Sequence, residues 1–506
     1  MTLDRRQFLR SGAGASLALA AGCDVPKGLQ TMMAFAPAKA GATGPFSSPQ
    51  LEELDAVSHA LNRATFGARP GDYQRVRALG ATPEAAARAF LEEQLNPERV
   101  ADDRAEWLVA RFETLREPLG ELFEYRERIL IEEIQRATLM RAIASERQLF
   151  EVMVQFWSDH FNIDPSKADC GWTKTADDRD VTRAHALGNF GEMLRASALS
   201  PAMLCYLDGR ENRKARPEDR PNENYARELL ELHTLGVHGG YTQQDVMEVA
   251  RCLTGWTVRG PGSKKFWPGL VEFKPHLHDK GSKVVLGKAI PEWPASMKPD
   301  AQVKHGEWEL ERVLEIVLTH PSTARYIAMK LCRRFISDDP PAAAVDAVSS
   351  AFTRTGGSIR PMLRALFDTP EFWSSRGGKL KRPFHFIVSA LRATGADTDA
   401  PRHLVDVLLR MGHAPFTYPT PDGFPEEASP WLGTLLWRWN FAIELCEGRV
   451  ARTKVNLDAL RTSHGGDEGL MAHLLGRKPG PEHIQCFHES GTGVALLLAS
   501  PAFQRC

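Results

Sequence analysis

Apolar residues recur at spacings of three and four along most of the chain, and this periodicity constrains the fold more than any other feature. Side chains at this spacing fall on one face of an α-helix. In residues 121–157 the positions that follow it are Leu122, Tyr125, Ile129, Ile134, Leu139, Ile143, Leu149, Val152, Val154 and Trp157. The segment is therefore predicted to be helical and to bury one face.

The same spacing predicts further helices at 183–198, 223–235, 243–256, 307–319, 322–336, 342–353, 360–368, 383–394, 402–411 and 431–447. Pro321 and Ser358 stand at predicted helix starts, and Gly236, Gly356 and Gly412 follow predicted ends. Alternating strand patterns are scarce. We therefore predict a mainly all-α fold, built as one large multi-helix domain or as two tightly packed lobes.

One stretch departs from the helical pattern. The chain near residues 257–290 is rich in Gly, Pro and Lys, with Phe273 and Val284–Val285 as candidate short strands. It is predicted to be a short irregular or hairpin insertion between helices.

The N-terminus carries the pattern of a twin-arginine signal peptide. Arg5 and Arg6 are followed by Phe8, Leu9 and a basic residue, and then by a small, weakly apolar run up to residue 22. A basic start of an amphipathic helix is the alternative. Residues 1–23 are thus predicted to direct export to the periplasm or cell envelope by the twin-arginine route.

Residues 19–23 also fit a lipobox, so Cys23 is a candidate site of lipidation; ordinary cleavage nearby with Cys23 unmodified is equally compatible. No later stretch approaches the ~20 apolar residues of a membrane-spanning helix, so lipid on Cys23 is the predicted membrane attachment. Residues 24–50, rich in Ala, Gly and Pro, are predicted to be a flexible linker, and 51–506 the helical domain.

Charge and cysteine content exclude several classes of protein. The formal net charge is -1, and without residues 1–22 (three Arg, one Asp) it is -3, which argues against nucleic acid as a partner. The basic runs Lys264-Lys265 and 379–382 are predicted to be solvated faces. None of the eight cysteines forms a Cys-x-x-Cys pair, which excludes zinc ribbons and thioredoxin-like chemistry; those after Cys23 are predicted to be buried free thiols.

The strongest candidate for chemistry is the helix predicted around residues 222–236. Asn224, Arg227, Glu228 and Glu231 fall within about a third of its circumference, and leucines cover most of the rest. One interpretation is that Glu228 and Glu231 serve a metal or acid–base chemistry, with Arg227 orienting them. The other is an internal Arg–Glu network that joins helices. Thr242 and Asp245 form a capping-box pattern just beyond it.

Two other segments carry candidate ligands. Asp159 and His160 end a long apolar helix. One prediction is that they bind a metal or transfer protons; the alternative is that they cap the helix among aromatic neighbours. His276 and His278 in the insertion put both rings on one side if the segment is extended, which suits a metal, and Asp279 beside them adds a carboxylate. A solvated loop is the alternative. No His-Glu-x-x-His, Gly-x-Ser-x-Gly or Walker motif is present.

Several blocks of sequence, including Phe156-Trp157-Ser158-Asp159-His160-Phe161, together resemble a family of exported bacterial proteins known as domain of unknown function 1800. The matching stretches, in order, are 59–67, 156–161, 201–208, 222–236, 241–256, 278–281, 320–325, 379–383 and 415–423. The resemblance implies a mostly helical protein, with no established catalytic residues. Members are often encoded beside a second exported family, domain of unknown function 1501, which is similar to sulfatases and alkaline phosphatases.

Two functions follow as hypotheses. The first is a metal-dependent enzyme, hydrolytic or oxidative, acting on an extracytoplasmic substrate; its catalytic candidates are Glu228, Arg227 and Asp159. The divalent metal would be held by a subset of Glu228, Glu231, His160, His276, His278 and Asp279. The second is a non-catalytic binding or assembly partner of a sulfatase-like exported protein, with residues 415–431 as a candidate surface. Convergence of the three candidate segments on one pocket favours the enzyme.

Overall fold

A computed structural model describes residues 46–260, 268–490 and 492–506. The predicted signal peptide, Cys23, the predicted linker up to residue 45, and Lys264 and Lys265 lie outside these residues. The last part of the predicted linker packs on the domain: the Phe46 amide donates to the Ser463 carbonyl at 2.9 Å, and Ser48 is buried. Contacts with the domain thus begin before residue 51.

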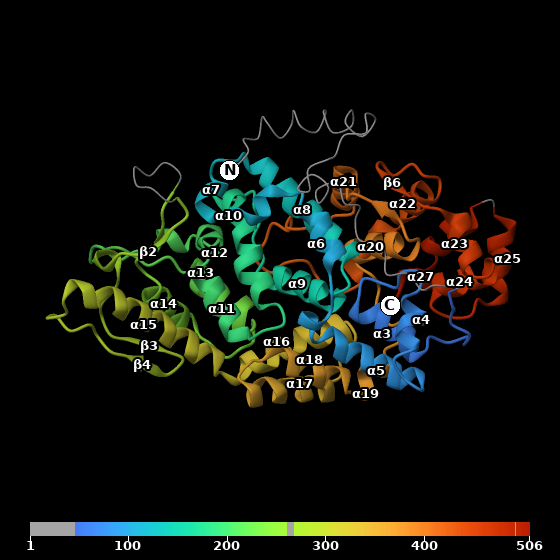
Figure 1. Cartoon of the computed structure of the whole chain (residues 1–506). Coiled ribbons are helices and arrows are strands. Elements are labelled where there is room, and N and C mark those ends of the chain that lie inside the picture. The colour runs from blue at the N-terminus through green and yellow to red at the C-terminus, as the bar shows by residue number, and fades with distance from the viewer. Residues whose placement is uncertain (1–45, 261–267, 491) are drawn as a thin grey trace. The chain divides into compact units, whose positions relative to one another are not determined.

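Helices make up most of the described chain, which confirms the mainly all-α fold (Figure 1). The first α-helices are α3 (Ala56–Ala64), α4 (Asp72–Arg77), α5 (Pro83–Gln94), α6 (Asp103–Val109), α7 (Leu119–Leu122), α8 (Glu127–Ala144), α9 (Gln148–His160), α10 (Cys170–Asp177), α11 (Phe190–Ala198) and α12 (Pro201–Tyr206). Those of the middle are α13 (Asn224–Glu228), α14 (Gln243–Cys252), α15 (Pro299–Leu318), α16 (Pro321–Phe335), α17 (Ala342–Thr355), α18 (Ile359–Phe367), α19 (Pro370–Ser374) and α20 (Pro383–Ala393).

The last α-helices are α21 (Arg402–Arg410), α22 (Leu435–Cys446), α23 (Leu457–Ser463), α24 (Asp467–Leu475), α25 (Pro481–Glu489), α26 (Gly493–Ala499) and α27 (Pro501–Gln504). Two helical segments are π-helices, η3 (Asp178–Arg183) and η5 (Leu229–Thr234). The 3₁₀ helices are η1 (Pro97–Arg99), η2 (Glu113–Arg116), η4 (Gly209–Glu211), η6 (Pro275–Leu277) and η7 (Ser429–Thr434).

Many helix boundaries follow the local signals in the sequence. Pro321 opens α16, and Gly356 ends α17 in the left-handed conformation (φ 61°), where glycine costs no steric strain. The capping box is confirmed, because the Thr242 side chain accepts from the Asp245 amide while the Asp245 carboxylate accepts from the Thr242 amide. The prediction for 121–157 was wrong in that the segment is not continuous: α7 ends at Leu122, α8 begins at Glu127, and a short break after Ala144 separates α8 from α9.

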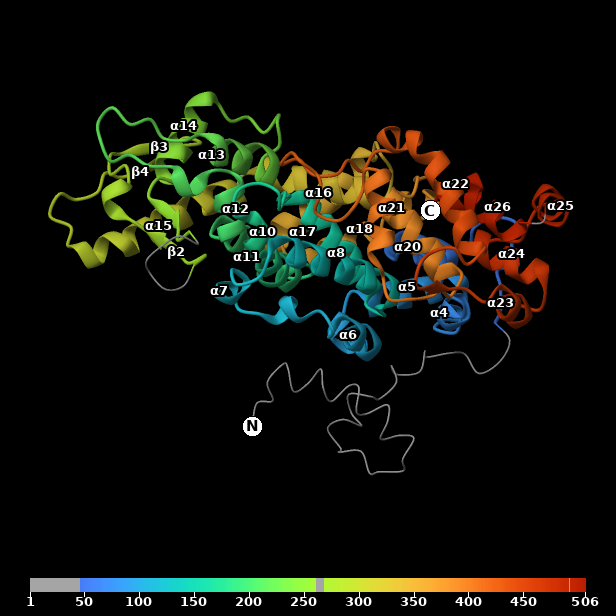
Figure 2. The ribbon, with the colours of Figure 1, turned by 90° about the horizontal axis from the view of Figure 1, so that it is seen from above.

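The predicted insertion is also confirmed. Strand β1 (Trp256–Val258) pairs antiparallel with β2 (Val271–Phe273), and β3 (Lys283–Val285) pairs with β4 (Lys288–Ile290) as a hairpin. A third pair joins β5 (Asp397–Thr398) to β6 (Thr453–Lys454). Strand β3 packs against α14, and Figure 2 shows β3 and β4 beside that helix.

Arginine side chains join distant parts of the chain inside the core. The Arg63 guanidinium of α3 is buried and donates to the carbonyls of Phe335, Ile336, Ser375 and Cys506, each within 2.8 Å. A buried cation is tolerated only where such partners replace water. These hydrogen bonds tie α3 to the end of α16 and to the C-terminal residue.

The cysteines and the helices bear on two further predictions. The seven cysteines of the described chain are all free thiols, and five of them are buried, whereas Cys446 is half-buried and Cys486 is exposed. Among the helices that the structure describes, none combines the length and the apolar character needed to cross a membrane.

Candidate functional site

Asp159, in the last turn of α9, belongs to a buried cluster of charges. The Arg382 guanidinium donates to the Asp159 carboxylate at 2.9 Å and lies 3.3 Å from the Glu426 carboxylate. Arg334 of α16 approaches the other oxygen of Glu426 at 3.5 Å. We call Asp159, Arg334, Arg382 and Glu426 the ion cluster. It joins α9, α16, the start of α20 and the loop before η7.

The two carboxyl groups of the ion cluster have different proton affinities. Burial raises the pKa of Asp159 to about 6, and the Glu426 charge adds to this, whereas Arg382 opposes it. Burial also raises the pKa of Glu426, but Arg382, Arg334 and two lysines outweigh it and hold the value at about 2. Glu426 is therefore ionised at all physiological pH values, while Asp159 titrates near neutrality.

A glycine allows the loop after α21 to close over the ion cluster. Gly423 has a φ of 73°, and a Cβ atom at this position would overlap the carbonyl oxygen of Asp159. The loop is held further by Asn162, whose amide donates to the carbonyls of Tyr418 and Thr420 at 2.9 and 2.8 Å. The same loop carries Asp422, which is exposed.

Lys330 of α16 points toward the same region. Its side chain is half-buried, and it makes no hydrogen bond or ion pair with any residue that the structure describes; its ammonium lies 5.7 Å from the centre of the Tyr326 ring. Burial lowers the pKa of Lys330 to about 8, although the charges of Asp159, Glu426 and Asp422 favour the protonated form. A lysine with a lowered pKa and no fixed partner is a candidate general base.

Glu228, the main sequence candidate, is also within reach of the Asp422 charge. Within the described ranges its carboxylate has no hydrogen bond or ion pair. Burial raises the pKa of Glu228, and the Glu231 and Asp422 charges raise it further, against Arg227. The charge of Asp422 therefore acts on both Glu228 and Lys330.

The remaining residues of the polar stripe have structural partners. Arg227 pairs with Glu223 at 3.0 Å and donates to the Gln243 side chain at 3.0 Å. The Glu231 carboxylate accepts from the Tyr241 hydroxyl at 3.0 Å. Each of the two interpretations of the stripe thus fits a different residue. Arg227 joins helices, as in the structural interpretation, whereas Glu228 is unpaired within the described chain. Arg227 contributes to the site through its charge.

The His160 side chain points in a different direction from that of Asp159, because adjacent residues of a helix are rotated about its axis. Its ring is 1% exposed, packs edge-on against Phe161 with centroids 4.5 Å apart, and has Nε2 3.1 Å from the His233 carbonyl. Burial holds the pKa of His160 well below its usual value, and the Lys330 charge lowers it further. A neutral imidazole among aromatic rings matches the alternative given for this helix end.

The histidines of the insertion do not share one side. The expectation of an extended segment was wrong, because 275–277 form the 3₁₀ turn η6, which leaves His276 exposed and His278 buried. His278 Nδ1 lies 2.8 Å from the Thr254 carbonyl, and its Nε2 lies 3.3 Å from the buried Glu309 carboxylate. Both ring nitrogens therefore have protein partners.

Asp279 is engaged by an arginine. The Arg251 guanidinium approaches its two carboxylate oxygens at 2.9 and 3.1 Å, and Glu248 approaches the same guanidinium at 2.8 Å. The pKa of Asp279 is lowered, because these hydrogen bonds and the Arg251 charge outweigh its burial.

The six predicted metal ligands occupy separate places. Glu228 and Glu231 lie near Asp422, His160 is in the aromatic core, and His276, His278 and Asp279 lie in the insertion. Across residues 46–260, 268–490 and 492–506, no three His, Cys, Asp or Glu side chains are grouped so as to hold a metal ion. The predicted divalent-metal set does not fit this arrangement, because ligands must converge within bonding distance of one ion. The three candidate segments thus do not converge on one pocket.

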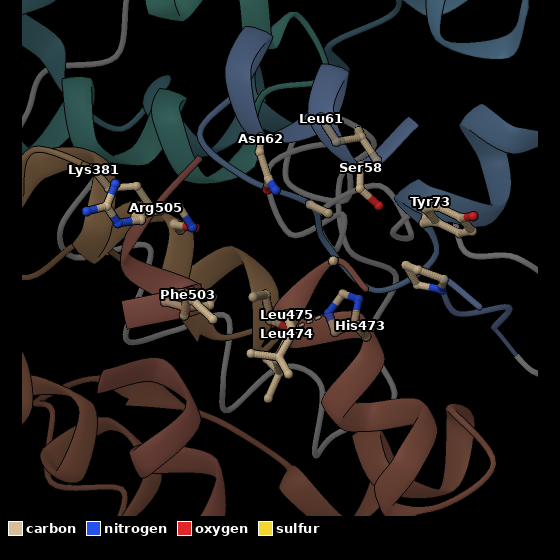
Figure 3. A pocket seen from close by; sticks show the side chains of 16 residues that line it. Ser58, Leu61, Asn62, Tyr73, Lys381, His473, Leu474, Leu475, Phe503 and Arg505 are labelled. Carbon is tan, nitrogen blue, oxygen red and sulfur yellow. Dashed lines mark hydrogen bonds between the residues drawn. The ribbon is translucent and has the colours of Figure 1, made fainter. Parts of the chain in front are cut away.

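A second lysine with a lowered pKa lies at a small cavity between α3, α24 and α27 (Figure 3). Burial lowers the pKa of Lys381 to about 8, and its ammonium donates to the Ser389 hydroxyl at 2.9 Å. Both residues are buried, and the cavity volume is about 30 Å³. This is room for little more than one water molecule, so the pair is inaccessible to a substrate.

The model of one family, described as protein of unknown function (DUF1800), matches residues 59–505. The chain belongs to the DUF1800 family. Neither the curated proteins nor the solved structures include a match to the chain.

In this DUF1800 protein, several of the stretches that carry the family resemblance contribute to the ion cluster or lie within reach of the Asp422 charge. Asp159 comes from 156–161, Glu228 from 222–236, Arg382 from 379–383 and Asp422 itself from 415–423. Sequence reasoning missed Arg382, because the basic run 379–382 was expected to be solvated, whereas Lys379, Lys381 and Arg382 are all buried. Lys330 carried no sequence signal, since an isolated lysine in a helix resembles any surface lysine.

Proposed function

We propose that this DUF1800 protein is an exported acid–base enzyme that hydrolyses an extracytoplasmic substrate, with Glu228 and Lys330 as its proton-transfer groups. One observation carries the proposal: both side chains are unpaired within the described chain, both lie within reach of the Asp422 charge, and their pKa values are shifted toward each other. Titratable groups with opposite shifts at one place are typical of acid–base sites.

The shifts assign a role to each group. Lowering the pKa of Lys330 to about 8 provides a neutral amine at mildly alkaline pH, which can take a proton from water. The raised pKa of Glu228 keeps a larger share of its carboxyl groups protonated, so that it can donate a proton to the leaving group. The negative charge of Asp422 favours the protonated form of both groups, which suits Glu228 as an acid; at Lys330 burial outweighs it and lowers the pKa.

Export is part of the proposal. The paired arginines at positions 5 and 6 support transport by the twin-arginine route, and Cys23 supports attachment to the envelope by lipid. Fractionation of cells that express the full chain tests both. Replacing Arg5 and Arg6 with Lys is expected to retain the protein in the cytoplasm, and Cys23→Ala to release it from the membrane fraction; unchanged fractions contradict these expectations.

The enzyme proposal is tested on the mature protein with chromogenic p-nitrophenyl esters, phosphates, sulfates and glycosides. We expect one class to be hydrolysed, with the rate rising as the pH approaches about 8 and Lys330 loses its proton. Lys330→Met and Glu228→Gln are expected to reduce kcat/KM at least ~100-fold. Lys304→Met and Glu124→Gln, at exposed positions, are the matched controls. Hydrolysis of none of the classes, or equal loss in the controls, overturns the proposal.

A second candidate function rests on an exposed apolar surface. Leu432, Leu435, Leu436, Trp437 and Trp439, on η7 and α22, are all exposed, Leu436 to 67% and Trp439 to 52%. Contiguous exposed apolar residues that include tryptophan are typical of protein-binding surfaces. This surface directly follows the stretch 415–431, and the occupant we propose is a co-exported sulfatase-like protein.

Binding by this surface is tested with a sulfatase-like protein exported by the same cell, using size-exclusion chromatography of the purified pair. Leu436→Glu combined with Trp439→Glu is expected to abolish a complex that the wild type forms. Val237→Glu, at another exposed apolar position, is the control and is expected to leave the complex intact. Absence of a wild-type complex removes this second function and leaves the enzyme proposal unaffected.

A further inference from the structure

A cavity of about 370 Å³ lies between α6, α8, α9 and the π-helix η3, apart from Glu228 and Lys330. Its volume is in the range of cavities that hold small organic ligands. We call it the arginine pocket, after the five arginines that line it: Arg116, Arg141, Arg147, Arg179 and Arg183.

Three of the arginines are held in place by the protein. Arg183 binds the Glu151 carboxylate with two hydrogen bonds, of 2.6 and 2.9 Å, and its guanidinium lies 5.2 Å from the centre of the Phe150 ring. Arg147 donates to the Val100 carbonyl at 2.8 Å. Arg179 donates to backbone carbonyls of the segment after α6. These contacts build a fixed wall rather than a mobile charged surface.

Arg141 is different. Its guanidinium is half-buried on α8 and makes no hydrogen bond or ion pair with the part of the chain that the structure describes. Burial and the neighbouring Arg183 charge lower the pKa of Arg141, although Glu151, Asp178 and Asp102 oppose them. A guanidinium carries five N–H donors in a planar fork that fits the two oxygens of an oxyanion. The fork of Arg141 lines the pocket without such a partner.

The acidic residues of the pocket leave room for an added negative charge. Glu151 is already neutralised by Arg183, and Glu106 lies 3.5 Å from Arg147. Burial raises the pKa of Asp102 to about 6, where its carboxylate already accepts from the Ser145 hydroxyl and the Glu146 amide. Burial also raises the pKa of Asp178.

The π-helix brings two of the lining residues to the same side. Asp178 and Arg183 are the ends of η3 and are five positions apart. In an α-helix such residues point about 140° apart, whereas i→i+5 hydrogen bonding stacks them. Both side chains therefore line the pocket. π-Helical turns of this kind occur frequently at functional sites.

The pocket also has an apolar wall. Ala105 and Val109 of α6, Leu115 of η2 and Phe150 of α9 line it beside the charged groups. Buried apolar surface of this kind binds the hydrocarbon part of a ligand while a few polar groups fix its orientation.

We propose that the arginine pocket binds a small organic oxyanion, with its carboxylate, phosphate or sulfate group on Arg141 and its apolar body against Val109, Leu115 and Phe150. The proposal is independent of the acid–base site, because the two share no residue and rest on different observations.

Isothermal titration of the mature protein with benzoate, phenyl phosphate and phenyl sulfate tests the proposal and separates the three headgroups. At least one is expected to bind with a Kd in the micromolar to millimolar range, whereas uncharged benzamide is not. Arg141→Met is expected to weaken binding at least tenfold. Arg325→Met, which removes an exposed guanidinium from α16, is expected to leave it unchanged.

Two further variants keep the result interpretable. If Arg141→Met does not fold, Arg141→Lys retains the charge without the planar fork and is still expected to weaken binding. Lys330→Met is expected to bind as the wild type does, even if the acid–base proposal fails. Failure of all three probes to bind, or equal binding of benzamide, overturns the proposal, as does unchanged affinity in the Arg141 variant that folds.

Discussion

Replacing Lys330 with methionine is expected to stabilise the protein while removing its activity. Lowering the pKa of this lysine from 10.5 to about 8 means that folding disfavours its charge. The shift corresponds to a penalty of about 3 kcal/mol. Because Lys330 is only half-buried, we expect Lys330→Met to raise the free energy of unfolding at pH 7 by about 1 to 3 kcal/mol.

The penalty depends on pH in a defined direction. Below pH 8 the ammonium is charged in both the folded and the unfolded protein, so the penalty is complete. Above pH 10.5 it is neutral in both, and the penalty disappears. The stability of the wild type relative to Lys330→Met should therefore rise between these values.

Urea unfolding at pH 7 and at pH 9.5, followed by circular dichroism, measures both effects. Lys174 is the informative comparison, because its ammonium lies 2.8 Å from Asp177 and both side chains are at most 3% exposed. Lys174→Met leaves a buried carboxylate unpaired and should cost about 3 to 5 kcal/mol. If Lys330→Met also destabilises the protein, Lys330 is a structural ion-pair partner and the reasoning is refuted.

Three further outcomes are expected. Arg382→Met, which removes a buried partner, should lower the free energy of unfolding by about 3 to 5 kcal/mol, whereas the surface Arg364→Met should cost at most ~1 kcal/mol in the same urea titration. Gly423→Ala should destabilise the loop by at least ~1 kcal/mol, because its Cβ overlaps the Asp159 carbonyl, and limited proteolysis should show faster cleavage there; an unchanged pattern contradicts this. Glu426→Gln should lower the free energy of unfolding by about 3 kcal/mol above pH 5. This difference from the wild type should shrink as the pH falls from 4.5 to 2, since the folded-state pKa of Glu426 is about 2. A difference that does not change with pH in acid titrations argues against it.

Buried cations are a general feature of this core. Arg392, for example, is 2% exposed and donates to the carbonyls of Gly67 and Ile143. Arg438, fully buried, donates to the Lys381 carbonyl at 2.8 Å. Around each guanidinium group, backbone carbonyls from segments far apart in sequence take the place of water. The arginines thereby fix how helices meet, at a cost in desolvation that the carbonyl dipoles offset.

The fold class was predictable because it depends on local rules. Three-and-four spacing, Pro321 at a helix start, Gly356 at a helix end and the capping box at Thr242 each act within one or two turns. The insertion was predictable for the same reason, since Phe273 and its neighbours alternate with turn residues. The break between α8 and α9 was missed, because it depends on Ser145, whose hydroxyl donates to Asp102, the residue just before α6.

The candidate site was predictable only in part. Glu228 was found because a polar stripe on an otherwise apolar helix is visible in the sequence. The same stripe also contains Arg227, whose side chain joins helices instead. His276 and His278 were grouped by spacing, and a single 3₁₀ turn sends them to opposite environments. Spacing along a chain describes orientation only while the backbone keeps one conformation.

The sequence by itself determined that the chain is helical, where most helices begin and end, which family it belongs to, and which residues are chemically able to act. The tertiary structure alone decided which of them do not already have partners. Lys330, Asp422 and Glu228 lie far apart in sequence, as do Arg141 and Arg183, and burial together with neighbouring charges sets their proton affinities. These electrostatic effects depend on distance through space, and helical periodicity carries no information about it.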